Sequence, residues 1–96
     1  MHVLAVEIEL RLASCQSLKE KRAVLRPIID GLRNRFTIAV AETDHQDVWQ
    51  QAAIGLAAVS GSPSHASEMM DEAERFVWSF PEVEVLETRQ RWLEED

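Results

Sequence analysis

The sequence predicts an α+β fold whose elements follow the order βαββαβ. Three observations lead to this prediction. Residues 3–12 alternate between apolar and polar side chains, residues 17–36 and 63–80 carry apolar side chains at helical spacing, and three further short stretches have the character of strands. The 96 residues, of which 46% are hydrophobic and 28% charged, are expected to form one globular domain over 1–96.

The first strand is expected over 3–12, where the alternation indicates one buried face and one face open to solvent. A helix is expected over 17–36. Ser17 and Glu20 have the spacing of a capping box, which satisfies free backbone N–H groups at the start of a helix. Pro27 removes one hydrogen bond from the helix interior, but the apolar spacing continues in phase across it. The sequence therefore predicts one bent helix rather than two short ones.

The second half of the chain supplies the remaining elements. Strands are expected over 37–42 and 52–60, with a hairpin between them, and a second helix over 63–80. The last strand is expected over 82–88, where the alternation shifts phase at Leu86 and indicates a β-bulge. This order, with the first and third strands in the centre, is the ferredoxin-like arrangement: a four-stranded antiparallel sheet with two helices on one face.

Charge is distributed unevenly along the chain. The formal net charge is −7, but seven of the ten Lys and Arg residues lie between positions 11 and 35. Four of them share one flank of the first predicted helix: Lys19, Arg22, Arg26 and Arg33. This stripe favours a local contact with an anionic partner, whereas a pI near 4.9 argues against general coating of nucleic acid or anionic membrane. The alternative is a solvated flank whose charges pair with Glu20 or Asp30.

A dense polar group lies near the predicted hairpin and consists of Glu42, Asp44, His45 and Asp47. Carboxylates beside a histidine can bind Mg²⁺ or Mn²⁺, or transfer protons in catalysis. Turn formation and a solvated sheet edge explain the same residues. Alternation predicts that Glu42 and Asp44 share a strand face while His45 turns away. Because the chain also lacks a glycine-rich phosphate loop and Cys15 has no basic neighbour close in sequence, we expect no catalytic residue, metal site or cofactor.

One face of the predicted sheet is expected to be bare, which favours a homodimer. Glu7 and Glu9 would lie on this face and repel phosphate, and the central strands offer no aromatic side chain for stacking on bases. Trp78 projects away from the apolar face of the second helix, and Trp92 lies near the C-terminus. Both tryptophans are candidate protein contacts.

The chain carries no recognisable targeting signal. Acidic residues interrupt the N-terminal apolar stretch, which argues against a signal peptide, and no run approaches the roughly 18 apolar residues of a membrane-spanning helix. The single cysteine cannot form an internal disulfide bond. A cytoplasmic protein without membrane association is expected.

Three stretches resemble the signature of the YlxP-like proteins, which are bacterial family 503 of the domains of unknown function. They are SLKEKR (17–22), RNRF (33–36) and AETDHQDVW (41–49). The resemblance covers nearly the whole chain and implies the ferredoxin-like fold, with no established activity. Genes of the family lie beside genes for translation initiation and ribosome maturation, which implies work around the ribosome or its RNA.

We therefore predict a non-enzymatic adaptor that acts around translation or ribosome maturation. It would contact ribosomal RNA or a ribosomal subunit through Lys19, Arg22, Arg26 and Arg33. A homodimeric protein-interaction module without a nucleic-acid role is the first alternative, with Trp78 or Trp92 as its anchor. A metal-dependent enzyme that uses the polar hairpin residues is the second.

Overall fold

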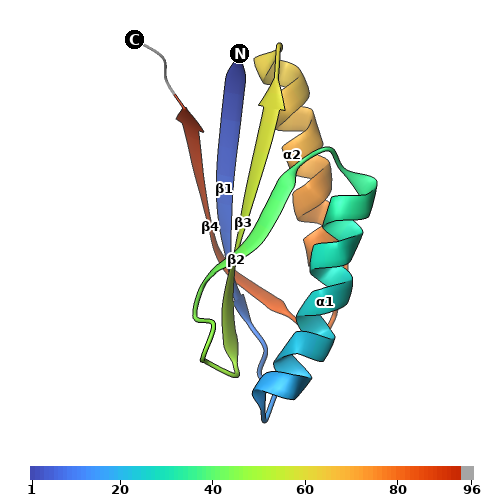
Figure 1. The fold of residues 1–96 in the computed structure, drawn as a ribbon, viewed down its shortest axis with the longest axis vertical. Helices are drawn as coiled ribbons and strands as arrows, with labels where there is room; N and C mark the ends of the chain where they lie inside the picture. Colours follow the sequence, from blue (N-terminus) through green and yellow to red (C-terminus); the bar gives the residue numbers. More distant parts are fainter. Residues whose placement is uncertain (94–96) are drawn as a thin grey trace.

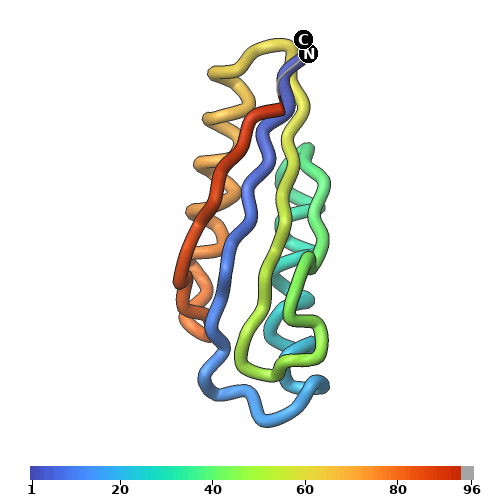
Figure 2. Tube along the Cα trace, turned by 90° about the vertical axis from the view of Figure 1, so that its left-hand side faces the viewer, coloured from blue at the N-terminus to red at the C-terminus, as the bar shows by residue number. Residues whose placement is uncertain are grey.

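The computed structural model describes residues 1–93 and contains the six predicted elements in the predicted order (Figure 1). Their bounds are β1 His2–Arg11, α1 Leu18–Arg35, β2 Ala39–Asp44, β3 Gln51–Ser60, α2 Pro63–Trp78 and β4 Glu84–Leu93. The strands form one antiparallel sheet in the order β2-β3-β1-β4, so the first and third strands are central. Both helices lie behind the same face of this sheet (Figure 2), which confirms the predicted ferredoxin-like fold.

The core lies between the sheet and the two helices. Every second residue of β1 from Leu4 to Leu10 is buried, and the residues paired with them in β3 face the same side. From α1 the buried apolar residues are Leu25, Ile28 and Leu32. Burial of each large aliphatic side chain contributes about 1.5–3 kcal/mol relative to exposure. The alternation in β1 therefore determines which face of the sheet the helices cover.

α1 begins at the predicted cap and continues through its proline. The Ser17 hydroxyl oxygen accepts a hydrogen bond from the Glu20 N–H at 3.1 Å, and the Glu20 carboxylate accepts one from the Gln16 N–H. Pro27 is exposed, and so is Ala23, whose carbonyl loses its helical donor to the proline. Because this side of the helix faces solvent, water can replace the missing donor. One continuous helix results, as predicted.

α2 has the predicted start and a slightly earlier end. The Ser62 hydroxyl oxygen accepts a hydrogen bond from the His65 N–H at 3.3 Å, which caps the first turn. The helix ends at Trp78, two residues before the predicted end, where the Ser79 N–H donates back to helix carbonyls. Neither helix within residues 1–93 is long and apolar enough to cross a membrane.

The hairpin between β2 and β3 contains a bulge that sequence alternation did not predict. The pairing of β2 with β3 slips between Glu42 and Asp44, which leaves Thr43 as an extra residue. Glu42 lies opposite Ile54 and faces the helices, whereas Asp44 lies opposite Ala53 and faces the open side. The prediction that Glu42 and Asp44 share a face is therefore wrong, because one inserted residue reverses the alternation beyond it.

His45 follows this bulge in a left-handed backbone conformation with φ 62°. Such a conformation costs a non-glycine residue on the order of 1–3 kcal/mol, and local contacts hold it in place. The His45 N–H donates to Asp44 Oδ1 at 2.8 Å, and the ring Nε2 lies 3.1 Å from Glu9 Oε2 on β1. The side chain thus lies over the open face of the sheet, and the prediction that it turns away from Asp44 is wrong.

β4 is longer than predicted. It extends to Leu93 because it pairs with β1 along nearly all of that strand. The predicted bulge at Leu86 is confirmed, since consecutive residues of β1 pair with Glu87 and Val85. Trp92 lies within the strand and packs against the core from the side that faces the helices.

Candidate functional site

A groove of about 440 Å³ runs between α1 and the edge strand β2, and we call it the α1–β2 groove. Three of the four predicted stripe residues line it together with one further lysine; these cations are Lys21, Arg22, Arg26 and Arg33. Two carboxylates from the side of the hairpin, Glu42 and Asp47, line it as well. The structure therefore brings the stripe against a partly acidic wall.

Lys19, Arg22 and Arg26 form the exposed flank of α1, and we call these three residues the basic ridge. A second hollow of about 540 Å³ surrounds Pro27 and is lined by all three. Arg22, Arg26 and Asp30 line both hollows, so these three residues stand on the crest between them. At 1.5 Å of rise per residue, the ridge spans roughly 10 Å along the helix axis, and Arg33 lies about 10 Å farther on.

The basic ridge carries unneutralised charge. Its three side chains are exposed, and no ion pair within residues 1–93 involves any of them. The alternative in which Glu20 or Asp30 neutralises the stripe by direct pairing is therefore not realised within these residues. Asp30 lines both hollows, so its carboxylate lowers the local positive potential, although it forms no ion pair with these side chains.

Arg33 differs from the ridge in having a structural contact. Its Nη2 donates a hydrogen bond to the Val40 carbonyl oxygen at 2.9 Å. Val40 belongs to β2, which is an edge strand of the sheet within residues 1–93. Arg33 thus covers part of an exposed sheet edge, a common protection against unwanted strand pairing. Only the rest of its guanidinium group is available to a ligand.

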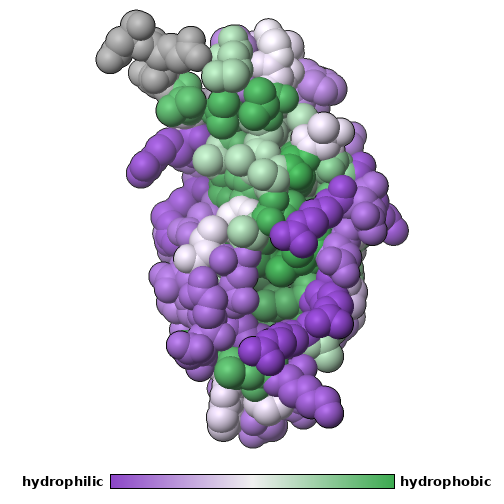
Figure 3. Space-filling view, viewed as in Figure 1, coloured by the Kyte–Doolittle hydropathy of each residue, from purple (hydrophilic) through white to green (hydrophobic). Residues whose placement is uncertain are grey.

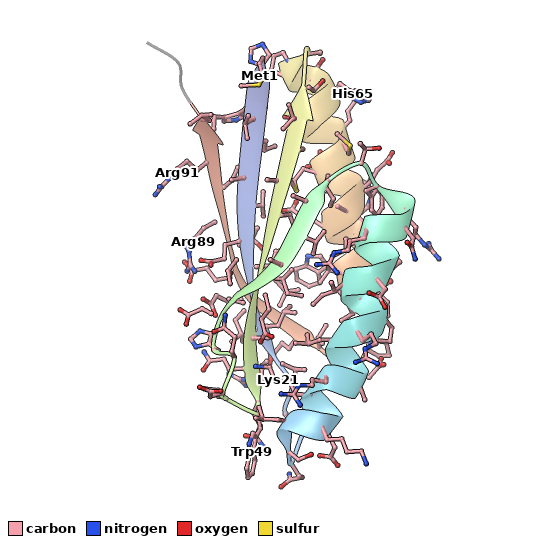
Figure 4. All side chains as sticks on the ribbon, viewed as in Figure 1. Met1, Lys21, Trp49, His65, Arg89 and Arg91 are labelled. Carbon is pink, nitrogen blue, oxygen red and sulfur yellow. The ribbon has the colours of Figure 1, made fainter. Side chains whose placement is uncertain are left out.

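Lys21 is a residue of the groove that the charge pattern did not single out. Its side chain is only 2% exposed, and its Nζ lies 2.9 Å from Glu42 Oε2 and donates to the His45 carbonyl oxygen at 2.5 Å. Figure 4 shows Lys21 extending from α1 toward the strands. Glu42 Oε2 receives no directed hydrogen bond, so the ammonium group holds it by charge. Lys21 thereby fastens the hairpin to the first helix.

The sequence did contain a signal for this burial. Lys21, Leu25, Ile28 and Leu32 recur at spacings of four, three and four residues, which is the spacing of a buried helix face, and all four are buried. A lysine in register with a buried apolar stripe indicates a paired interior charge rather than a solvated one.

On the open face of the sheet, Arg89 of β4 connects three carboxylates. Its Nη2 lies 2.6 Å from Glu7 Oε1 and 3.0 Å from Glu9 Oε1, and its Nη1 lies 2.9 Å from Glu87 Oε2. Thr43 donates its hydroxyl to Glu7 Oε2 at 2.6 Å. Hydrogen bonds from Arg89 first and Thr43 second lower the pKa of Glu7, and the carboxylates raise the pKa of Arg89. The network spans β4, β1 and the bulged end of β2.

The residues considered for metal binding or catalysis are separated in space. Glu42 pairs with Lys21 under the helix, while His45 and Asp44 lie over the open face. No group of three or more His, Cys, Asp or Glu side chains within residues 1–93 is arranged to hold a metal ion. Cys15 is buried, and burial raises the pKa of its thiol, which disfavours the reactive thiolate.

The open face also holds an apolar trough of about 530 Å³. Small residues such as Ala5 and Ala57 line it, together with the charged residues Glu7, Arg89 and Arg91. Val59 and Leu93, each 59% exposed, add further apolar surface on this face. Figure 3 does not look onto this face, which lies at the left of that view; it shows a band of hydrophobic side chains down the middle of the molecule with hydrophilic residues on both sides.

The two candidate tryptophans have different surroundings. Trp78 is 65% exposed at the end of α2, as its position in the helical pattern predicts. Trp92 is partly buried against the core, so little of its ring is free for a partner. Trp49, at the tip of the hairpin, is also exposed.

The chain was compared with known proteins. Residues 3–90 match the family described as "Protein of unknown function (DUF503)". The "Uncharacterized protein YlxP" of Bacillus subtilis (strain 168) is 40% identical over 87 residues, which cover 91% of this chain and 95% of that protein. The solution NMR structure of a de novo designed protein with a ferredoxin fold, LFR1 1, matches 99% of this chain and 88% of its own with a TM-score of 0.57 and 11% identity. The designed protein is a likeness of fold alone.

Proposed function

Because the chain belongs to the DUF503 family of proteins of unknown function, we propose a role from the surface that it presents. The protein is a non-enzymatic adaptor that associates with RNA and holds it through the basic ridge. In this proposal the protein acts in translation or ribosome maturation. This setting follows from the gene neighbourhood of the family, whereas the choice of RNA as partner follows from the charge on the ridge.

The cations of the basic ridge carry the proposal. Lys19, Arg22 and Arg26 are exposed and have no ion-pair partner within residues 1–93, although the net charge of the whole chain is −7. A polyanion is repelled by most of such a molecule and attracted to the ridge, so the field of the protein orients the encounter. Phosphates recur every ~3.4 Å of axis along each strand of a B-form DNA duplex, and no farther apart along the axis of the A-form RNA duplex, so a ridge of this length reaches more than one of them.

A non-enzymatic role is supported by the engagement of the reactive side chains. Glu42 pairs with Lys21, and His45 lies against Glu9, so each already has a structural partner. Cys15 is buried with a raised thiol pKa. A catalytic site would instead bring such groups together around a space where a substrate can react.

Co-sedimentation with purified ribosomal subunits tests the proposal. The wild-type protein is expected to sediment with a subunit at low salt and to leave it at high salt, because phosphate contacts release counterions. The double variant Arg22→Glu and Arg26→Glu should remain in the supernatant at both salts. The matched control is Arg75→Glu with Arg91→Glu, which changes the net charge equally on α2 and β4. The proposal would be contradicted if the wild-type protein sediments equally at low and high salt and the ridge variant sediments as much as the wild type.

A homodimeric protein-interaction module is a second candidate, favoured by the apolar trough on the open face. Exposed Val59 and Leu93 lie on the same face, and a monomer rarely leaves a large contiguous apolar patch uncovered. The two candidates are compatible, because α1, which carries the basic ridge, lies on the other side of the sheet from the open face (Figure 2).

A further inference from the structure

We propose that the basic ridge binds double-stranded RNA through its phosphate backbone, in preference to single strands. The preference rests on the proposed function, because it specifies which form of RNA the same ridge holds. Three properties of the ridge and its surroundings lead to it: the lack of aromatic residues in the two hollows beside it, the charged network on the open sheet face and the position of its arginines on a crest.

Single-strand binding combines a basic groove with aromatic side chains on which bases stack. Neither hollow beside the ridge is lined by an aromatic residue; the apolar lining of the α1–β2 groove is aliphatic, from Leu18, Leu25 and Ile29. Beyond the end of α1, Phe36 meets Phe76 edge to face, and the Arg35 guanidinium lies 4.7 Å from the Phe76 ring centroid. Unstacked bases of a single strand that lies along α1 would therefore contact aliphatic side chains and not aromatic rings.

The sheet offers no alternative surface for single strands. RNA-recognition motifs of similar topology stack bases on aromatic residues of the central strands. Here the open face of β1 presents Glu7 and Glu9, which Arg89 ties into a network with a third carboxylate. Trp92 lies on the opposite side of the sheet, against the core. Phosphates would meet carboxylates on this face, where Arg89 is already paired and Arg91 is the remaining cation of the trough, so a single strand gains no stacking and little charge attraction there.

The shape of the charged surface favours a duplex as well. A single strand laid in the α1–β2 groove would bring its phosphates toward Glu42 and Asp47 on the opposite wall. Arg22 and Arg26 stand instead on the crest between two hollows, where a broad ligand can reach them without entering the groove. Double-stranded RNA is such a ligand, because proteins recognise it mainly by its shape, phosphates and 2′-hydroxyl groups rather than by its bases.

Two RNAs with equal numbers of phosphates separate the possibilities. One is a blunt duplex of about 20 base pairs, slightly longer than the span of a typical double-stranded RNA-binding domain. The other is an unstructured oligouridine of about 40 nucleotides, which matches its charge. Fluorescence anisotropy at about 50 and 200 mM salt measures the affinity for each. We expect the duplex to bind at least about tenfold more tightly, and Arg22→Glu with Arg26→Glu to abolish this binding while Arg75→Glu with Arg91→Glu retains it.

Each other outcome overturns a defined part of the proposal. If the oligouridine binds as tightly as the duplex, and the ridge variant still abolishes binding, the preference for duplexes is wrong while RNA binding by the ridge stands. If neither RNA binds, or if the ridge variant binds both like the wild type, RNA binding by the ridge is wrong as well. Equal losses in the ridge variant and the matched control would show that net charge, and not the ridge, determines binding.

Discussion

Lys21 and Glu42 form an ion pair between α1 and β2 in which the two partners are unequally buried. The Nζ–Oε2 distance is 2.9 Å, the lysine side chain is 2% exposed, and the glutamate side chain is 25% exposed. If Lys21 is removed, the Glu42 carboxylate, whose Oε2 is buried beside the lysine, can turn toward water because the rest of its side chain is partly exposed. If Glu42 is removed, the His45 carbonyl is the one partner that the ammonium group keeps within residues 1–93. The pair also fixes the position of Glu42, which lines the α1–β2 groove on the side of β2.

Substitutions at this pair should therefore have unequal effects on stability. Glu42→Gln leaves a buried charge without a counter-charge and is expected to lower the free energy of unfolding by about 3 kcal/mol or more. Lys21→Met replaces the lysine by an apolar side chain of similar volume and leaves a carboxylate that can turn toward water, so its cost should be smaller, about 1–2 kcal/mol. Urea denaturation of the two variants measures the difference. Equal losses, or a larger loss for Lys21→Met, would refute the asymmetry.

Glu7 should contribute to the loss of stability at acid pH. Its pKa is lowered from the ordinary value of 4.5, chiefly by the hydrogen bond from Arg89. The folded state binds this proton more weakly than the unfolded state. The stabilisation is thus complete above pH 4.5 and is lost as the pH falls through the lower folded pKa. In Arg89→Ala we expect the pKa of Glu7 to rise, as NMR titration of its side chain would show. Identical titration curves in the two proteins would be inconsistent with this role of Arg89.

Pro27 is expected to reduce stability; it lines the hollow beside the basic ridge but has no charge and no donor with which to bind a phosphate. A proline inside a helix costs roughly 3 kcal/mol, and its restriction of the unfolded chain returns up to about 1 kcal/mol. Pro27→Ala should therefore raise the free energy of unfolding by about 2 kcal/mol, because alanine restores the hydrogen bond to the exposed Ala23 carbonyl. Thermal and urea unfolding measure the gain, and RNA affinity should stay unchanged. An unchanged or lower free energy of unfolding would show that the backbone of α1 is adapted to Pro27, so that alanine gains no hydrogen bond there.

The apolar trough predicts self-association of the open sheet face. Light scattering at tens of micromolar protein should give the mass of a dimer. Val59→Asp places a charge on the exposed apolar surface and should give a monomer with unchanged thermal stability at low concentration, because Val59 is already exposed in a single chain. A wild-type monomer at these concentrations would rule out this assembly.

The periodicity of apolar residues and the helix-capping residues were sufficient to predict most of the fold from the sequence. The alternation in 3–12 identified the buried face of β1, and Ser17 with Glu20 located the start of α1. The phase shift at Leu86 located a bulge, because the apolar pattern itself changed there. The bulge at Thr43 left no such mark, since its neighbours are polar on both faces of an edge strand.

The candidate site was predicted only in part for a related reason. Helical projection identifies residues on one flank, so it grouped Arg33 with Arg22 and Arg26. It contains no information about the neighbouring strand, and therefore could not show that Arg33 donates to the Val40 carbonyl. The pairing of Lys21 with Glu42 likewise depends on which face of β2 the bulge presents to the helix.

The salt dependence of RNA affinity tests binding by the basic ridge most directly. The logarithm of the association constant for a duplex RNA, plotted against the logarithm of salt concentration, has a slope proportional to the number of phosphates that the protein neutralises. Neutralising two contacts with Arg22→Gln and Arg26→Gln should weaken binding and reduce the magnitude of that slope by about two. Arg75→Gln with Arg91→Gln should leave the slope unchanged. A ridge variant that folds normally and keeps both the wild-type affinity and the wild-type slope would contradict RNA binding through the ridge.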